Sequence, residues 1–320
     1  MNEDYLWDRS GPADPEIARL EQALAPLRYR HRAALAEAAA PRPRVWWAAA
    51  AAALLAAMGA WQLRMPASQP TSWQVSSVEG ASRLGGRSAA ISMSMRTGQT
   101  LRTGPDSQVS LSSGAVGEID LGPDSELRAA GSEQLMLDRG RLHAFIWARP
   151  GSFVVDTPSA RAIDLGCMYT INVDGSGNGL LRVSVGWVAF QHQGRESFIP
   201  AGAECVTRRR EGPGIPFYED APEALRQGVS LFDAGEISAA LDPILSSARP
   251  RDGLTLWHLL TRLPAAGRGR VFDRFAQLVA LPPEISREAV VERDPRSIDR
   301  CWDALNLENT EWWRGWERKW

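Results

Sequence analysis

The sequence predicts a multidomain protein with a single transmembrane helix, an all-β domain built as a roll or solenoid-like sandwich, and a repeat-like α-helical C-terminal domain. Residues 45–63 carry no charged side chain. Residues 74–210 hold many short β-type runs between glycine and Pro-Asp turns, and residues 219–320 repeat leucine and aromatic residues at helical spacing. At 320 residues, the chain is long enough for two folded domains of roughly 100–200 residues each.

Composition excludes several classes of function. The formal net charge of −2 gives no excess of Lys and Arg of the kind that nucleic-acid binding needs, so we expect no direct contact with nucleic acid. The chain has no phosphate-binding loop, Rossmann fingerprint or nucleophile elbow, and we expect no cofactor and no enzyme activity. The histidines occur in four separate segments: His31, His143, His192 and His258. None lies at a recognised catalytic spacing from a carboxylate and a nucleophile.

Residues 45–63 have the length needed to cross a bilayer. At about 1.5 Å rise per residue, a helix of this length nearly spans a hydrocarbon core of roughly 30 Å. Trp46, Trp47 and Trp61 lie at its two ends, where indole side chains favour the membrane interface. The arginines gather on the N-terminal side of the stretch: Arg28, Arg30, Arg32, Arg42 and Arg44. This bias predicts a single-pass protein with a cytoplasmic N-terminus and its C-terminal domains outside.

Two alternatives to a membrane anchor remain for this stretch. An alanine-rich helix could instead be buried in a soluble core. A cleaved signal peptide is disfavoured because 44 residues precede the apolar run, far more than a short basic leader. Residues 64–73 are rich in proline, serine and threonine, and we expect a linker there.

Residues 1–44 predict a short cytoplasmic segment with one amphipathic helix. Asp14, Pro15 and Glu16 are typical of a helix start. The apolar residues that follow recur at helical spacing, with an aromatic residue near the N-terminus: Trp7, Ile17, Leu20, Leu24 and Leu27. Because so short a segment buries little apolar surface by itself, we expect these side chains to contact a cytoplasmic protein. The alternative is a helix lying on the inner membrane surface.

The β-rich region contains a short internal repeat. The sequence Gly-Pro-Asp-Ser occurs at 104–107 and again at 122–125, and each copy is followed after one residue by an apolar strand residue. A roll or solenoid-like sandwich of stacked short strands would explain this repeat. The glycine-rich run at 175–179 is typical of a hairpin turn.

Several ordered motifs in this region resemble the periplasmic domain of the FecR family. They are Leu101-Arg102-Thr103-Gly104-Pro105-Asp106, Ile119-Asp120-Leu121-Gly122-Pro123-Asp124-Ser125-Glu126-Leu127, the Arg-Gly turn at Leu137-Asp138-Arg139-Gly140-Arg141-Leu142, Phe153-Val154-Val155-Asp156-Thr157-Pro158, Asp164-Leu165-Gly166-Cys167-Met168-Tyr169, Val183-Ser184-Val185-Gly186-Trp187-Val188 and Pro200-Ala201-Gly202. The similarity covers about 140 residues, within the 74–210 domain.

The resemblance implies a regulator in the bacterial inner membrane. Proteins of the FecR family contact an outer-membrane partner in the periplasm and control an extracytoplasmic-function sigma factor inside the cell. We therefore expect a sigma-factor-like cytoplasmic partner and a periplasmic or outer-membrane protein partner. This chain departs from the family in its shorter cytoplasmic segment and its large helical C-terminal part. The alternative is an envelope scaffold or binding protein that is anchored by its N-terminus and has no role in transcription.

Two further expectations concern the domains outside the membrane. Cys167 and Cys205 would both lie on the oxidising side, so we expect a disulfide between them, the alternative being two buried residues that never meet. The tryptophans at the C-terminal end alternate with charged residues: Trp312, Trp313, Trp316 and Trp320. This ending predicts either a helix at the membrane interface or a segment packed onto the preceding helices.

Overall fold

The computed structural model describes Arg19, Gln22 and residues 72–307. Arg19 and Gln22 are helical and exposed. The predicted partner contacts at Trp7, Ile17, Leu20, Leu24 and Leu27, the stretch 45–63, almost all of the linker and the Trp-rich ending lie outside these residues. Among the residues described, no helix is both long and apolar enough to span a bilayer.

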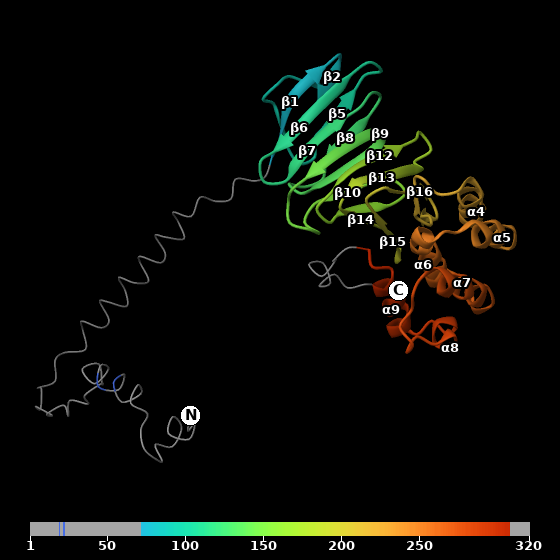
Figure 1. The fold of residues 1–320 in the computed structure, drawn as a ribbon. Coiled ribbons are helices and arrows are strands. Elements are labelled where there is room, and N and C mark those ends of the chain that lie inside the picture. Colours follow the sequence, from blue (N-terminus) through green and yellow to red (C-terminus); the bar gives the residue numbers. More distant parts are fainter. Residues whose placement is uncertain (1–18, 20–21, 23–71, 308–320) are drawn as a thin grey trace, which may run out of the picture. The chain divides into compact units, whose positions relative to one another are not determined.

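The structure is mainly β-sheet with a helical region at the C-terminal side, as the sequence predicts. The strands form two layers, A and B, which share β9 (Gln134–Ile146) (Figure 1). Layer A holds β1 (Trp73–Glu79), β4 (Ser94–Met95), β6 (Gln108–Ser113), β7 (Gly117–Leu121), β12 (Met168–Val173), β13 (Gly179–Val185), β16 (Ala203–Arg208), β17 (Gly212–Pro213) and β18 (Phe217–Tyr218). Layer B holds β2 (Ser82–Leu84), β3 (Arg87–Ser88), β5 (Thr100–Thr103), β8 (Glu126–Ala129), β10 (Val154–Asp156), β11 (Arg161–Asp164), β14 (Trp187–His192) and β15 (Arg195–Pro200).

The core lies between the two layers and follows the two-residue period of the strands. Along β6 and β7, Val109, Leu111, Ile119 and Leu121 are each at most 1 % exposed, while their neighbours in sequence face outward. Because a one-residue slip would turn these side chains to solvent, the pattern fixes the register of both strands.

The two Gly-Pro-Asp-Ser motifs form equivalent corners between the layers. The first joins β5 of layer B to β6 of layer A, and the second joins β7 of layer A to β8 of layer B. The corners are tied together, since the Thr103 Oγ1 hydroxyl donates to the Gly122 carbonyl (2.6 Å) and accepts from the Ser125 N–H (2.9 Å). The Gly-Pro-Asp-Ser repeat in the sequence therefore corresponds to a repeated corner of the sandwich.

The predicted turn at Arg139-Gly140 is wrong, because these residues lie within the continuous strand β9. Its first half pairs with β8 and β10 in layer B, and its second half pairs with β7 and β12 in layer A. Gly140 lies where the strand passes between layers and adopts φ 97°, a left-handed conformation that favours glycine. An Arg-Gly pair that looks like a hairpin turn in sequence is here the bend of a single strand.

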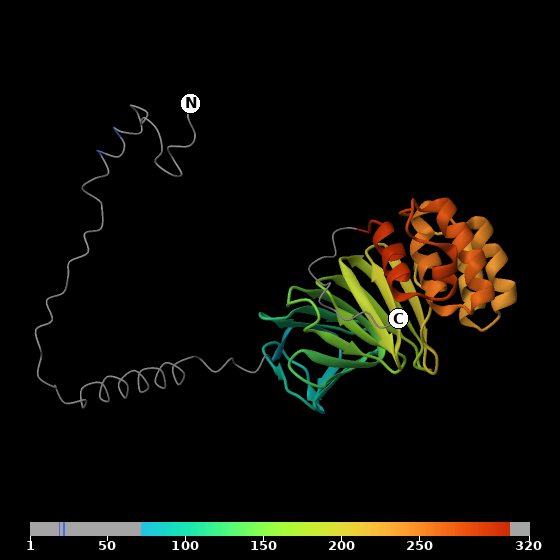
Figure 2. The same ribbon diagram turned by 90° about the horizontal axis from the view of Figure 1, so that it is seen from below.

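The helical region follows β18 and consists of short helices: α4 (Glu223–Asp233), α5 (Ile237–Ser247), the 3-10 turn η2 (Pro250–Asp252), α6 (Gly253–Arg262), α7 (Ala265–Leu278), α8 (Arg287–Val291) and α9 (Pro295–Ala304). Helices α4 and α5 pack together, as do α6 and α7. The helices gather at the edge of the β region that carries β14 to β16 (Figure 2). Helix α6 is buried from Gly253 to Thr261, which makes it the central helix of the region.

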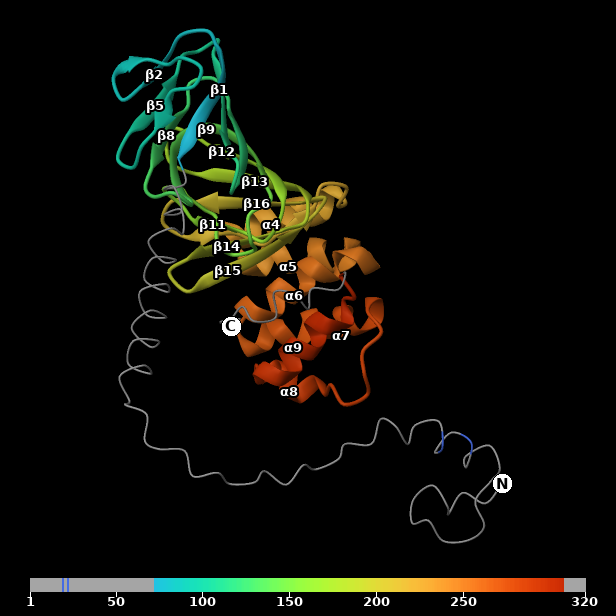
Figure 3. The ribbon, with the colours of Figure 1, turned by 90° about the vertical axis from the view of Figure 1, so that its left-hand side faces the viewer.

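An aromatic cluster joins the helical region to layer B. Figure 3 shows helix α6 next to β15 of this layer. Trp302 of α9 lies 5.9 Å from Trp187 of β14 and 5.5 Å from Phe198 of β15, measured between ring centroids. Trp257 of α6 lies 4.6 Å from Trp302. Because helices cover this part of the layer, β14 is buried on both faces from Trp187 to Phe190.

Buried hydrogen bonds add to this junction. His258 of α6 is fully buried and lies between two backbone groups: its Nε2 accepts from the Phe198 N–H (3.1 Å), and its Nδ1 faces the Leu254 carbonyl (2.9 Å). A carbonyl only accepts, so Nδ1 carries the proton and the ring is neutral. Burial, followed by the nearby Arg262 charge, lowers the pKa of His258 to about 3. The β and helical regions thus meet through an ordered interface.

Candidate functional site

The candidate site is the outward side of layer A, here called the outer face. It is made of the side chains of β6, β7, the second half of β9, β12 and β13 that point away from the sandwich core. Cross-strand pairing sets three of its residues in one row, with Phe145 opposite Met168 and Met168 opposite Val185. A second row contains Asp120, His143 and Thr170.

The first row and the nearby Trp147, which follows β9, form an exposed apolar patch, here called the aromatic patch: Phe145, Trp147, Met168 and Val185. Phe145 and Trp147 are each 46 % exposed and Val185 is 56 % exposed. The Phe145 and Trp147 rings meet edge to face with centroids 5.6 Å apart, and the Trp147 Nε1–H donates to the Gly114 carbonyl (3.0 Å). These contacts hold the indole in place, so the patch presents a preformed aromatic surface. Aromatic side chains of this kind are enriched at protein interfaces.

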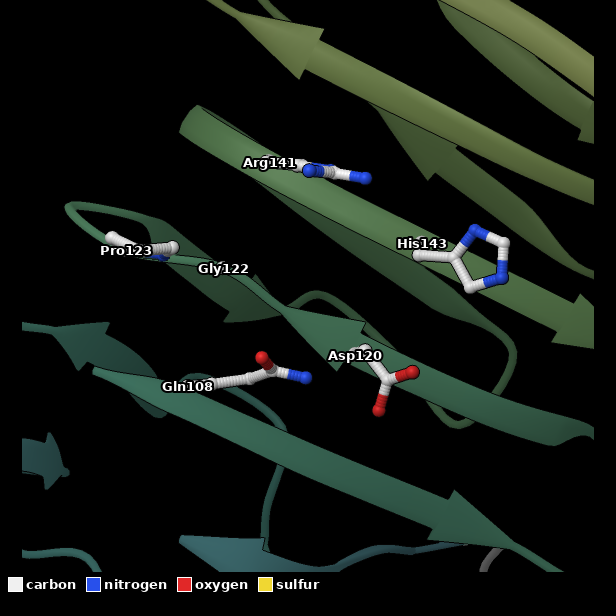
Figure 4. Close-up of a pocket in the computed structure, with 6 residues that line it drawn as sticks. All are labelled: Gln108, Asp120, Gly122, Pro123, Arg141 and His143. Carbon is white, nitrogen blue, oxygen red and sulfur yellow. The ribbon is translucent and has the colours of Figure 1, made fainter. Parts of the chain in front are cut away.

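A polar hollow of about 290 Å³ lies on the same face, and His143 in its wall is two residues before Phe145 on β9. Figure 4 shows the six residues that line it. Its walls are Gln108 of β6, Asp120 of β7, and Arg141 and His143 of β9, with Gly122 and Pro123 at one end. The Asp120 carboxylate accepts from the Ser110 hydroxyl (2.6 Å), and the His143 ring lies 3.0 Å from the Thr170 hydroxyl. Acidic, basic and amide groups therefore stand together next to an apolar surface, a combination typical of protein recognition.

The aromatic patch was not among the features predicted from the sequence. Residues 141–147 nevertheless contain a pattern typical of such a patch. Leu142, Ala144 and Ile146 face the core, and two of the outward-facing residues between and after them, Phe145 and Trp147, are aromatic. Because both faces of β9 are apolar at this end, the pattern predicts that its outward face also contacts another apolar surface. Only the register of β12 and β13 brings Met168 and Val185 beside the two rings.

The predicted disulfide between Cys167 and Cys205 is absent, and all three cysteines are free and buried. Met168, next to Cys167, pairs with Val185, whereas Cys205 pairs with Leu181 on the opposite edge of β13. Val185 and Leu181 are four residues apart on β13, a distance of about 13 Å along the strand. The two cysteines also lie on opposite sides of β13. A disulfide requires Cα atoms within roughly 7 Å, so this fold cannot form the bridge.

Each of the two thiols has its own surroundings. The Cys167 thiol donates to the Asp164 carboxylate (2.5 Å), which also accepts from the Gly166 N–H (2.7 Å). Burial raises the pKa of Asp164 to about 7, although both hydrogen bonds act to lower it. Burial likewise raises the pKa of the Cys205 thiol to about 12. Both thiols stay protonated at neutral pH, which makes them poor nucleophiles.

Among residues 19, 22 and 72–307, we find no group of three or more His, Cys, Asp or Glu side chains that could hold a metal ion. His143 lines the polar hollow, His192 lies at the end of β14, and His258 is buried in the junction between the β and helical regions. The described structure does not bring these three histidines into one site.

Comparison with known proteins gives little further information. No protein-family model matches the chain. No curated protein matches it either. Two solved structures, both described as candidate anti-sigma factors from Parabacteroides distasonis ATCC 8503, resemble parts of it at 14 % and 13 % sequence identity. The matches cover 42 % and 45 % of this chain and 63 % and 73 % of those chains, each with a TM-score of 0.33.

Proposed function

We propose that this chain is a membrane-anchored signalling regulator of the FecR type, which passes a periplasmic protein contact to a sigma-factor-like partner in the cytoplasm. The observation that carries the proposal is the aromatic patch, a preformed apolar surface beside a hollow with charged walls on the exposed side of the β region. Support for the remainder comes from the sequence: the ordered FecR-like motifs, the uncharged stretch 45–63 and the arginine bias before it.

The outer face suits a protein partner better than a small molecule. A small-molecule pocket buries most of its ligand, whereas the polar hollow is partly open to solvent and lies on the same face as the exposed patch. Protein interfaces place aromatic anchors at the centre and polar groups around them. Phe145 and Trp147 would be the anchors here, with Arg141, His143 and Asp120 as the polar border. The partner in this scheme is a periplasmic or outer-membrane protein, and we propose no enzymatic role.

The variants Phe145→Asp and Trp147→Asp test this surface. Loss of an aromatic anchor typically costs at least about 2 kcal/mol of binding free energy, and we expect each variant to weaken partner capture by about 30-fold or more. Because both side chains are about half exposed, thermal unfolding should change little. The measurement is quantitative pull-down of envelope proteins with wild-type and variant chains, read alongside thermal unfolding.

Ile91 provides a matched control for these variants. It is also a large apolar side chain, 65 % exposed, but it lies in the loop between β3 and β4 rather than in the aromatic patch. The Ile91→Asp variant should capture partners as the wild type does. Equal losses from Ile91→Asp and Trp147→Asp would show that the patch has no special role.

Variants of the N-terminal segment test whether the chain passes its signal to a cytoplasmic partner. Replacing Leu20 and Leu24 together by Asp puts charge into the apolar stripe, and we expect it to alter transcription of a defined set of genes as strongly as deletion of residues 1–44 does. Membrane insertion of the Leu20/Leu24 variant should be unchanged, because the 45–63 stretch and the arginines before it are intact. The measurement is RNA sequencing of cells that carry each version.

Arg19 and Gln22 offer the control for this test, since both are exposed and helical and lie outside the apolar stripe. Their joint replacement by Ala should leave transcription at the wild-type level. An envelope scaffold, the alternative function, gives a different result: neither the deletion nor the Leu20/Leu24 variant changes transcription, while envelope partners are still captured.

A further inference from the structure

The Asp164 carboxyl group lies inside the β sandwich, where strands normally place apolar side chains. Side chains alternate along a strand, so Asp164 shares the inward face of β11 with Ala162, and it is 1 % exposed. Its carboxylate accepts from the Cys167 thiol and from the Gly166 N–H. All of these partners belong to the turn between β11 and β12, residues 164–167, here called the Asp164 turn.

The titratable groups that face Asp164 in the described structure carry no positive charge. On β12, burial raises the pKa of Tyr169 well above its usual range, and Asp164 and Cys167 act in the same direction. On β14, the residue opposite Asp164 is Val188. The turn between β9 and β10 donates a backbone N–H to the Asp164 carbonyl (2.6 Å), but its cation, Arg149, is exposed to solvent. An ionised Asp164 would therefore be a buried charge without a counter-ion.

The Asp164 turn also holds two parts of the aromatic patch in place. The Cys167 carbonyl accepts from the Ile146 N–H (3.1 Å), and Ile146 lies between the two aromatic residues of the patch. On the other side, Gly186 packs so closely on the Gly166 carbonyl that no Cβ would fit, and Gly186 directly follows the patch residue Val185. Opening of the Asp164 turn would release the backbone beneath both parts of the patch.

Loss of the Asp164 proton weakens the closed form of the turn. Burial raises the pKa of Asp164 to about 7 in the folded chain, above the ordinary value of 3.8 that it regains when the turn opens. Because the closed turn has the higher pKa, its added stability is complete below pH 3.8 and is lost as pH rises through 7. Each pH unit between these two values shifts the opening equilibrium by up to about tenfold.

We propose that Asp164 is a positioning residue whose carboxyl proton holds the aromatic patch in place, so that the patch is ordered most firmly in acid and loosens as the pH rises toward neutral. The inference rests on the function proposed above for this patch and adds regulation by pH to it. A surface that is ordered before binding pays less entropy on binding, so a partner would bind more tightly at the lower pH.

Thiol labelling of the full-length chain in detergent micelles tests the proposal, with 4,4′-dithiodipyridine as the reagent. A buried thiol reacts only after local opening, so Cys167 reports on the Asp164 turn. Cys301 of α9 is the internal control, because it is also free and buried and its pKa is raised by burial alone. From pH 5 to pH 7, we expect the ratio of Cys167 to Cys301 labelling to rise about tenfold or more.

Two variants separate the carboxyl proton from a merely structural role. Asp164→Asn cannot ionise, and we expect its labelling ratio to stay constant within about twofold over the same pH range. Asp233→Asn is the matched control, since burial raises the pKa of Asp233 as well, to about 6, but this carboxylate accepts from the Ile215 N–H, away from the Asp164 turn. The Asp233 variant should keep the wild-type rise.

Hydrogen exchange supplies a second readout at the patch itself. After correction for the intrinsic effect of pH, exchange of the Ile146 and Trp147 amides should speed up about fivefold or more from pH 5 to pH 7, relative to the Leu111 amide of β6. Both wild-type measurements stand even if a variant fails to fold. A labelling ratio that does not change with pH, or patch amides that keep pace with Leu111, would overturn the proposal.

Neither readout needs a partner, so the proposal can fail separately from the function proposed above. Loss of the pH effect with intact partner capture would remove only the regulation by Asp164. A pH effect that persists in Asp164→Asn would also overturn it, since the proton would then belong to another group.

Discussion

Replacing Gly140 by alanine is expected to lower the free energy of unfolding by about 4 kcal/mol or more, the range reached when backbone conformation and packing are both violated. Gly140 has φ 97°, and a Cβ added there would overlap the side chain and Cα of Ser125. Moving Ser125 would also break the hydrogen bond in which its Oγ accepts from the Arg141 N–H (2.9 Å). Urea unfolding followed by circular dichroism measures the change.

Gly98 is a matched control for Gly140. It also has a positive φ, 85°, but a Cβ there would meet no atom within 4 Å. Gly98→Ala should therefore cost only the backbone strain, about 1 kcal/mol. Similar losses at the two positions would mean that β9 does not pass between the layers as described.

His258 is expected to make the structure sensitive to acid. Its pKa is about 3 in the folded chain and 6.5 when unfolded, so the unfolded state binds the proton first as pH falls. The stabilisation by neutral His258 is complete above pH 6.5 and is lost progressively as pH falls toward 3. Between pH 6.5 and 4.5 the loss is about 3 kcal/mol, at roughly 1.4 kcal/mol per pH unit.

Two buried carboxyl groups act in the opposite direction over the same range. Burial raises the pKa of Asp164 to about 7 and that of Asp233 to about 6, so each takes up a proton in the folded state first and adds stability as pH falls. The wild-type profile alone therefore does not isolate His258. The measurement is urea unfolding of wild type and His258→Gln at pH 7.5 and 4.5. The variant should lose about 3 kcal/mol less than the wild type over this interval, and parallel profiles would contradict a neutral buried His258.

Local sequence patterns predicted much of the fold. The short β-type runs expected in 74–210 are strands, the repeated Gly-Pro-Asp-Ser motif lies at two equivalent positions of a sandwich, and the run at 175–179 forms the β12–β13 hairpin. These features depend on neighbours in sequence. The path of β9 did not follow from sequence, because a glycine with positive φ suits a hairpin turn and a strand bend equally well. Contact with Ser125, 15 residues earlier, decides between them.

The candidate site was less accessible to sequence reasoning, because it depends on strand register. Phe145, Met168 and Val185 lie on three strands, and no local pattern predicts that they form one row. The same limitation explains the disulfide prediction, which considered the compartment of the two cysteines but not their separation across β13. His258 was one histidine among four in the sequence, and only its two backbone partners distinguish it.

We propose that residues 45–63 divide the chain between two compartments, so that the outer face meets partners outside the membrane while residues 1–44 stay in the cytoplasm. The most direct test is to fuse alkaline phosphatase, which is active only after export, to the C-terminal end of the full chain, and to fuse β-galactosidase in parallel as the reporter active only in the cytoplasm. We expect high phosphatase and low galactosidase activity, with the fusion protein in the membrane fraction. An active galactosidase fusion, or a fusion protein recovered in the soluble fraction, would rule out this topology.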